Sequence, residues 1–297
     1  MGCPRKKPRN LVSSLLLRFL TEVADSFKLP RFVLRTSGIG VFRASAAIPL
    51  LREEGYLPIQ ASRLEDPVPE LPPLRVKDLP FAKNFQPQAS SSLVQPDESS
   101  ISWLDKQAPK SVIYVSFGSI AAVKENEFVE IAWGLAYCEH TFLWVIRPGS
   151  VHGSKWLESL PSGFLDLLGV SGHIVKWAPQ LEVLAHPAVG AFWTHNGWNS
   201  TLESICAGVP MICMPCFTDQ FVNARYVTHV WKVGVQLENV LERKTIEEVI
   251  RRLMEDEEGE EIRNRVEDFK EKAIFSLRRG GSSYATLECL ISCISSS

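Results

Sequence analysis

The chain has 297 residues, of which 45% are hydrophobic and 22% charged, and its formal net charge is −2. This composition is typical of a globular protein and excludes a nucleic-acid partner held by a strongly basic surface. No apolar run approaches the roughly 18 residues of a membrane helix, which excludes integral membrane association and makes a cytoplasmic location the expectation.

The first part of the chain predicts few regular elements. Helical periodicity over residues 15–23 precedes a candidate strand at 31–35 and a candidate helix at about 42–53. Prolines then recur through residues 67–96, where they exclude a helix interior or a central strand. We interpret this stretch as a linker.

These observations predict two domains. We place the linker proper at residues 86–98, between a first domain of residues 1–85 and a second of residues 99–297. The first domain is too short to be a complete Rossmann-like domain, so we expect it to be partial.

Beyond the linker, short apolar segments alternate with helical patterns. We expect strands at residues 111–116, 141–146, 172–176, 189–194, 210–215 and 233–237. We expect helices at residues 125–138, 246–256, 258–279 and 282–294. This alternation predicts an α/β fold in which the second domain is Rossmann-like and built on a parallel sheet.

A candidate anion site follows the apolar strand at residues 189–194. The loop contains His195 and Gly197, and a helix is expected from about Trp198. A helix N-terminus offers free N–H groups and partial positive charge, and glycine lets backbone approach a ligand closely. The alternative is that Asn199 or Ser200 merely caps this helix.

Several other sites are disfavoured by missing motifs. The chain has no GxGxxG for a dinucleotide, no phosphate-binding GxxxxGK[ST] loop and no Asp-x-Asp pair to hold a metal ion. We therefore expect neither a cofactor nor a metal. The pair Cys213 and Cys216 lies in an apolar run and is interpreted as structural.

The 44 residues from Trp177 to Gln220 carry a specific resemblance. They include WAPQLEVLAHPAVGAFWTHNGWNSTLES and end in PCFTDQ. This segment resembles the signature box of plant secondary-product UDP-glycosyltransferases, which are family 1 enzymes of the GT-B fold. The similarity extends from about residue 100 to the C-terminus, and residues 11–80 resemble an internal part of the N-terminal domain of that family.

This resemblance implies a complete C-terminal UDP-sugar-binding domain and a truncated, internally deleted N-terminal domain on the acceptor side. It also implies a donor site for UDP-glucose or a related UDP-sugar, without a metal. At the nucleotide end, the implied contacts are stacking on uracil by Trp177, hydrogen bonding to the uracil edge by Ala178 and Gln180, and ribose binding by Glu203.

The resemblance assigns the diphosphate to the turn after residue 194 and to a second loop. The implied diphosphate contacts are His195, Gly197, Asn199, Ser200 and, after another strand, Ser119. At the sugar end, the implied contacts are Trp198, Asp219 and Gln220, and the terminal glutamine favours glucose. Alternatives stay open: Trp177 as a core residue, His195 as a structural histidine and Asp219 as a helix cap.

No catalytic residue is identified. Transfer to a hydroxyl needs a base, usually a histidine oriented by a carboxylate. All six histidines lie at position 140 or later, at 140, 152, 173, 186, 195 and 229, so the catalytic His and Asp of the family are not found.

Three functions therefore compete. The first is an inverting UDP-glycosyltransferase that transfers glucose to a hydroxyl of a small plant metabolite such as a flavonol. The second is a non-catalytic UDP-sugar-binding remnant that lacks the base. The third is a nucleotide-dependent oxidoreductase, against which the missing glycine-rich fingerprint argues.

Overall fold

The computed structural model describes residues 11–14, 25–26, 28, 31–34, 37–80, 97, 99–119, 121–151, 156–169, 171–238 and 241–296. The chain divides into two compact units. Unit 1 joins residues 1–37 to residues 272–297, and unit 2 contains residues 38–271. In unit 1, strands β1 (Leu11–Ser14) and β2 (Arg31–Leu34) pair in parallel, and helix α12 (Ser282–Ser296) ends the chain.

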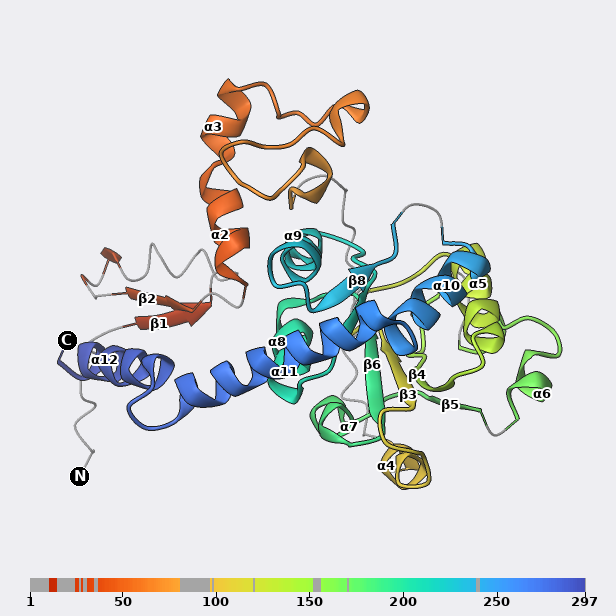
Figure 1. Ribbon diagram of the computed structural model, residues 1–297. Helices are drawn as coiled ribbons and strands as arrows, with labels where there is room; N and C mark the ends of the chain where they lie inside the picture. The colour runs from red at the N-terminus through yellow and green to blue at the C-terminus, as the bar shows by residue number, and fades with distance from the viewer. Residues whose placement is uncertain are drawn as a thin grey trace, which may run out of the picture. The chain divides into compact units, whose positions relative to one another are not determined.

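Unit 2 is built on a six-stranded sheet in which every pairing is parallel (Figure 1). The spatial order is β5-β4-β3-β6-β7-β8. The strands are β3 (Val112–Ser116), β4 (Thr141–Val145), β5 (Gly172–Val175), β6 (Val189–Thr194), β7 (Met211–Cys213) and β8 (Gly234–Gln236). Each lies within a segment for which the sequence predicts a strand, so the predicted parallel α/β sheet is confirmed.

Helices cover both faces of this sheet. One core contains side chains from α5 (Glu125–Tyr137), α6 (Phe164–Leu168) and α10 (Arg243–Met254). The opposite core contains side chains from α4 (Ser99–Leu104), α7 (Gln180–Ala185), α8 (Trp198–Ala207), α9 (Asp219–Arg225) and η3 (Tyr226–Val230). Helix α11 (Glu257–Leu277) contributes to both, through Ile262 and Val266.

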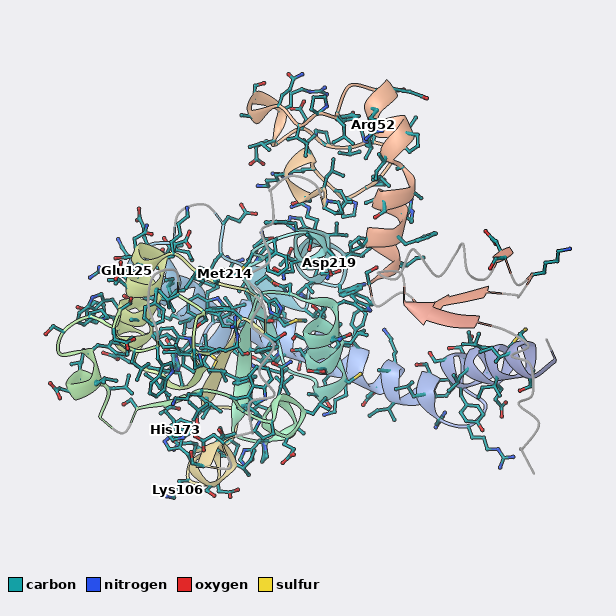
Figure 2. All side chains as sticks on the ribbon, turned by 180° about the vertical axis from the view of Figure 1, so that it is seen from behind. Arg52, Lys106, Glu125, His173, Met214 and Asp219 are labelled. Carbon is teal, nitrogen blue, oxygen red and sulfur yellow. The ribbon has the colours of Figure 1, made fainter. Side chains whose placement is uncertain are left out.

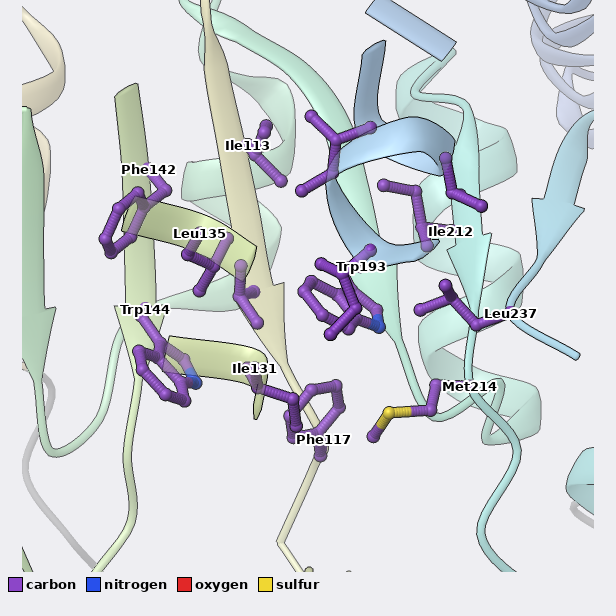
Figure 3. Close-up of a cluster of buried hydrophobic side chains, with 14 of the residues drawn as sticks. Ile113, Phe117, Ile131, Leu135, Phe142, Trp144, Trp193, Ile212, Met214 and Leu237 are labelled. Carbon is purple, nitrogen blue, oxygen red and sulfur yellow. The ribbon is translucent and has the colours of Figure 1, made fainter. Parts of the chain in front are cut away.

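The strands form because both of their faces are apolar. Successive side chains of a strand point to opposite faces, and a strand covered on both sides is apolar at every position. In β3, Ile113 and Val115 enter the first core, whereas Val112 and Tyr114 enter the second. Figure 3 shows the first core, where Trp193 from β6 lies among aliphatic side chains of neighbouring elements.

Residues 38–80 form a small folded layer against α9. They contain α2 (Ile39–Ala46), α3 (Ile48–Glu53) and two short turns, η1 (Ala61–Arg63) and η2 (Val76–Asp78). Helices α2 and α3 replace the single helix expected at 42–53, and the break precedes Pro49, which is tolerated in the first turn of α3.

The proline-rich stretch is not a linker over residues 67–80. Val68, Leu71, Leu74 and Leu79 are buried in a third core, together with Val222 from α9. Prolines exclude a helix interior or a central strand, but an irregular backbone can still bury every second or third side chain. Residues 81–96 and the helix expected at 15–23 lie outside the described residues, and the domain boundaries at 85 and 98 stay a prediction.

Among the described residues, no helix is both long enough and apolar enough to cross a membrane.

Candidate functional site

The site predicted by the sequence lies where the strand order reverses. From the middle of the sheet, β3, β4 and β5 follow one another toward one edge, and β6, β7 and β8 follow one another toward the opposite edge. The loops after β3 and β6 therefore leave adjacent strands and diverge, and open α/β sheets bind ligands in such a crevice. Ser116 pairs with Thr194 at the ends of these strands, which brings Gly118 beside His195.

The imidazole of His195 is held between two glycines. A β-carbon on Gly118 would lie 2.5 Å from His195 Cε1, and one on Gly197 would lie 2.6 Å from Nε2. Larger residues at either position would displace the ring. Burial lowers the pKa of the His195 imidazole from its ordinary value of 6.5 to about 4, so the ring is neutral at pH 7. A neutral imidazole presents one N–H donor, and nearby phosphate charge would favour its protonation.

The N-terminus of α8 is free of side-chain capping. Its N-cap is Gly197, which makes no side-chain capping hydrogen bond. The first N–H groups of a helix have no intrahelical acceptor, so this turn keeps donors and partial positive charge. Asn199 is exposed and Ser200 is buried, but both lie inside α8 and follow the N-cap. The alternative that either residue caps the helix is therefore wrong.

A hydrogen-bonded cluster links the candidate uracil and ribose contacts. The Nε2 group of Gln180 donates to Ser200 Oγ at 3.0 Å and to Glu203 Oε2 at 2.6 Å. The hydroxyl of Tyr114 on β3 donates to Gln180 Oε1 at 3.5 Å. The turn at residues 177–180 is therefore joined directly to the first two turns of α8.

Trp177 and Ala178 begin this turn, beyond the carboxyl end of β5. Ala178 is buried in the second core, whereas the Trp177 side chain is only partly buried. The Trp177 carbonyl accepts a hydrogen bond from the Asp97 N–H at 3.0 Å, which fixes its backbone. Partial burial does not decide between a core residue and a stacking surface, and stacking on uracil stays a prediction.

Two of the candidate sugar contacts, Asp219 and Gln220, follow β7 and the loop that begins near Met214; Met214 and Asp219 are labelled in Figure 2. Asp219 is the first residue of α9. Its carboxylate accepts from Thr218 Oγ1 at 2.9 Å and from Asn223 Nδ2 at 3.1 Å. The alternative that Asp219 caps α9 is wrong, since the N-cap is Thr218.

Gln220 and Trp198 have structural contacts of their own. Gln220 is 2% exposed, and its Oε1 accepts from the N–H groups of Cys216 and Phe217. A sugar contact by Gln220 would thus use its Nε2. The Trp198 ring packs near Trp231, with 6.3 Å between ring centroids, and a β-carbon on Gly38 would lie 2.8 Å from it. Both sugar contacts stay predictions.

Sequence reasoning missed a buried arginine behind the Ser119 loop. Ser119 itself is exposed after β3. The Arg147 guanidinium donates to the carbonyls of Ala121 at 2.9 Å and Gly118 at 3.4 Å, and burial lowers its pKa. Arg147 thereby fixes the loop that carries Ser119 and places a positive charge behind it. The sequence signal was a charged residue directly after the apolar segment at residues 141–146.

The described residues contain no metal cluster, and Cys213 is not a reactive thiol. Among these residues no group of three His, Cys, Asp or Glu side chains could hold a metal ion. Cys213 is fully buried, and burial raises the pKa of its thiol to about 12. This excludes an activated thiolate at Cys213 and agrees with the structural role predicted for it.

The other described histidines have partners outside this crevice. His140 and His186 contact the carboxylates of Glu255 and Asp105, respectively. His173 stacks on Trp103, and His229 contacts Arg225. His152 lies outside the described residues, and the sequence holds no histidine before position 140.

Comparison with known proteins identifies the family to which the chain belongs. The family model for UDP-glucoronosyl and UDP-glucosyl transferase matches residues 91–266, more than half of the chain. UDP-glycosyltransferase 76C1 of Arabidopsis thaliana is 45% identical over 335 aligned positions, which cover 93% of this chain and 72% of the relative. The alignment is longer than the chain itself, so the relative contains residues within the aligned span that this chain lacks.

Two further relatives carry informative names. Flavonol 3-O-glucosyltransferase UGT76E12 of Arabidopsis thaliana is 45% identical over 296 positions, which cover 96% of this chain and 63% of the relative. The structure of Phytolacca americana UGT2 complexed with UDP-2fluoro-glucose and pterostilbene superimposes with a TM-score of 0.81 at 28% identity, covering 96% of this chain and 76% of that one.

The fold is thus α/β of the GT-B type, with the C-terminal Rossmann-like sheet complete and the N-terminal domain only partial. The chain belongs to the UDP-glycosyltransferase family, in the plant family 1 group of EC 2.4.1 enzymes that transfer a sugar from a UDP-sugar to small plant metabolites. The family assignment drawn from residues 177–220 is confirmed, and the oxidoreductase alternative is wrong.

Proposed function

We propose that this chain binds UDP-glucose at the carboxyl edge of its six-stranded sheet and transfers glucose, with inversion, to a hydroxyl of a small plant metabolite. The observation that carries the proposal is the joint placement of an uncapped α8 N-terminus, His195 and the Gln180–Glu203 pair at the topological switch point. Each provides donors or acceptors that match one part of a nucleoside diphosphate.

In the proposed complex, the uracil stacks on Trp177 and its edge meets Ala178 and Gln180. Glu203 accepts hydrogen bonds from the ribose hydroxyls. The α8 N-terminus supplies N–H groups to the diphosphate, because helix N-termini bind anions, and Asn199 and Ser200 lie in that first turn.

His195 and Ser119 complete the diphosphate site from the two adjacent loops. The low pKa of His195 fits this role, because a buried neutral imidazole gains most from a nearby phosphate that favours its charged form. A UDP-sugar as the ligand is supported by the solved relative Phytolacca americana UGT2, which is complexed with UDP-2fluoro-glucose.

The glucose end of the donor is proposed to meet Asp219 and Gln220. The Asp219 carboxylate is already oriented by two hydrogen-bond donors, and it retains acceptor capacity for sugar hydroxyls. The acceptor is proposed to be a hydroxyl of a small phenolic compound such as a flavonol, in line with the relative named flavonol 3-O-glucosyltransferase. Direct attack by that hydroxyl on the anomeric carbon would convert an α-linked donor into a β-glucoside.

A second candidate function is donor binding without turnover. It is favoured by one observation: the residues before position 140 contain no histidine to act as a base. In this case the chain keeps the donor site of unit 2 and lacks the group that would deprotonate the acceptor.

Two measurements on the purified 297-residue chain separate these functions. Calorimetric titration with UDP and UDP-glucose tests the donor site, and chromatography of a flavonol incubated with UDP-glucose tests turnover. Binding with a β-glucoside product supports the transferase, and binding without product supports the second candidate. If neither UDP nor UDP-glucose binds, both proposals fail.

A further inference from the structure

The side chain of Asn223 bridges two parts of the proposed donor site that are far apart in sequence. Its Nδ2 group donates to the backbone carbonyl of Asn196 at 2.9 Å and to Asp219 Oδ2 at 3.1 Å. Asn223 is 2% exposed and lies on α9, four residues after Asp219, so the two side chains share one face of the helix.

The orientation of this amide follows from its neighbours. A carbonyl oxygen and a carboxylate oxygen both accept hydrogen bonds, so only the NH₂ end of Asn223 can satisfy them. Both protons of that NH₂ group are used. The reversed amide would place its own oxygen against two other oxygens, which is electrostatically unfavourable.

One of these bonds fixes the turn before α8. Asn196 has a φ of +59° and is fully buried, so it holds an uncommon left-handed conformation. Its carbonyl belongs to the planar peptide that continues to Gly197, the N-cap of α8. The Asn223 hydrogen bond therefore restrains the plane of that peptide. A further bond, from the Asn196 N–H to Thr194 Oγ1 at 3.2 Å, restrains the preceding peptide.

The other bond fixes the proposed sugar-binding carboxylate. Thr218 Oγ1 holds Asp219 Oδ1 and Asn223 Nδ2 holds Oδ2, so neither oxygen can rotate freely. We propose that Asn223 is a positioning residue that sets the Asp219 carboxylate and the diphosphate-binding turn at residues 196–197 in one geometry. This inference rests on the proposed function, because it takes Asp219 as the glucose contact.

The test compares the affinities for UDP-glucose and UDP. Asn223→Ala removes both bonds, and Asn223→Asp keeps the size of the side chain but replaces the donor with a second carboxylate beside Asp219. We expect both variants to bind UDP-glucose at least about tenfold more weakly at pH 8, with a smaller loss for UDP, as the removal of a hydrogen bond to a charged group predicts. Thr228→Val, which removes a hydroxyl near the end of α9, should leave both affinities unchanged.

Lowering the pH gives a signature that a merely structural role would not produce. Two adjacent carboxylates raise each other's pKa, and a protonated Asp side chain donates one hydrogen bond. Between pH 8 and pH 5.5 the terminal phosphate of UDP takes up a proton, because its second pKa is about 6, whereas UDP-glucose has no such group. The ratio of the two affinities is therefore compared with that of the unmodified chain at each pH. Asn223→Asp should approach the unmodified ratio as the pH falls, whereas Asn223→Ala should stay a constant factor away from it. In an Asp219→Asn background, Asn223→Ala should no longer change that ratio.

The outcomes distinguish failure of the proposed function from failure of the positioning role. If the unmodified chain binds neither ligand, the proposed function fails. If it binds both ligands and the Asn223 variants change UDP and UDP-glucose affinity by the same factor, or not at all, the positioning role is overturned. Loss of the folded state in both Asn223 variants, judged by circular dichroism, would also overturn it in favour of a purely structural residue.

Discussion

The ring of His195 lies directly against Gly118, although 77 positions of the sequence separate the two residues. The Cα of Gly118 is so close that a β-carbon would lie 2.5 Å from His195 Cε1. This contact joins the loops after β3 and β6 across the switch point of the sheet. The proposed diphosphate site therefore requires glycine at position 118, because any side chain there would collide with the aromatic ring of His195.

Gly118→Ala should displace the His195 ring and weaken UDP binding by about tenfold or more. The new methyl group would collide with the ring, and the φ of +72° would add about 1 kcal/mol of backbone strain. Calorimetric titration with UDP measures the change. The matched control is Gly149→Ala, which has a φ of +77° but nothing within 4 Å of the new methyl. An equal loss of affinity in both variants would contradict the contact.

Acidification should destabilise the chain through His195. The pKa of this residue is lowered by burial from 6.5 to about 4, so the unfolded state takes up its proton first as the pH falls. This loss of folding stability is absent above about pH 6.5 and grows to roughly 3 kcal/mol as the pH approaches 4. Urea unfolding of the unmodified chain and of His195→Gln from pH 7.5 to 4.5 should show a steeper decline in the former. If the free energy of unfolding declined equally with pH in both proteins, the lowered pKa of His195 would be refuted.

Glu203→Gln should remove the preference for a ribose over a deoxyribose. The glutamine can still accept the hydrogen bond from Gln180, but it loses the charged acceptor proposed for the ribose hydroxyls. A hydrogen bond to a charged group contributes about 1.5–3 kcal/mol, so the unmodified chain should bind UDP at least about tenfold more tightly than 2′-deoxy-UDP. Competition titration measures both ligands, and retention of the full preference in Glu203→Gln would place the ribose elsewhere.

Arg225→Met should strongly destabilise the layer formed by residues 38–80. The Arg225 guanidinium is buried, donates to the Pro73 carbonyl at 3.1 Å and lies 3.6 Å from the Asp78 carboxylate, whose pKa is raised by burial. Removing one partner of a buried pair costs about 3–5 kcal/mol, because the other charge stays buried and uncompensated.

Thermal unfolding measures this cost. Asp78→Asn combined with Arg225→Met should be less destabilised than the sum of the two single variants, because no unpaired charge remains. Lys244→Ala is the control, since its partner Glu248 lies 4.0 Å away on the surface. Additive effects in the double variant would show that the pair is not coupled.

Much of the fold follows from the sequence because its strands are apolar on both faces. Each of β3 to β8 lies in a segment predicted to be a strand, and the parallel sheet follows from the helices between them. The packing of residues 67–80 could not be predicted in this way. Its buried side chains follow no regular period, and Val222 completes their core from more than 140 positions away.

The candidate site also has one part that the sequence predicts and one part that it does not. Residues 177–220 were recognisable because a motif of fixed spacing carries them. Tyr114, Arg147 and Asn223 were not, because each contributes through a contact with a distant segment: the Gln180 amide, the carbonyls of the Ser119 loop and the Asn196 carbonyl. No spacing rule connects such partners before the topology is known.

The most direct test of the account is calorimetric titration of the chain with UDP, compared across three variants. Trp177→Ala removes the surface on which the uracil is proposed to stack, and His195→Ala removes the proposed hydrogen-bond donor to the diphosphate. Each variant should bind UDP about tenfold or more weakly. Trp133→Ala, which removes an indole of α5 that packs against Phe164 of α6, should leave UDP affinity unchanged. Unaltered UDP affinity in both Trp177→Ala and His195→Ala would contradict the proposed site.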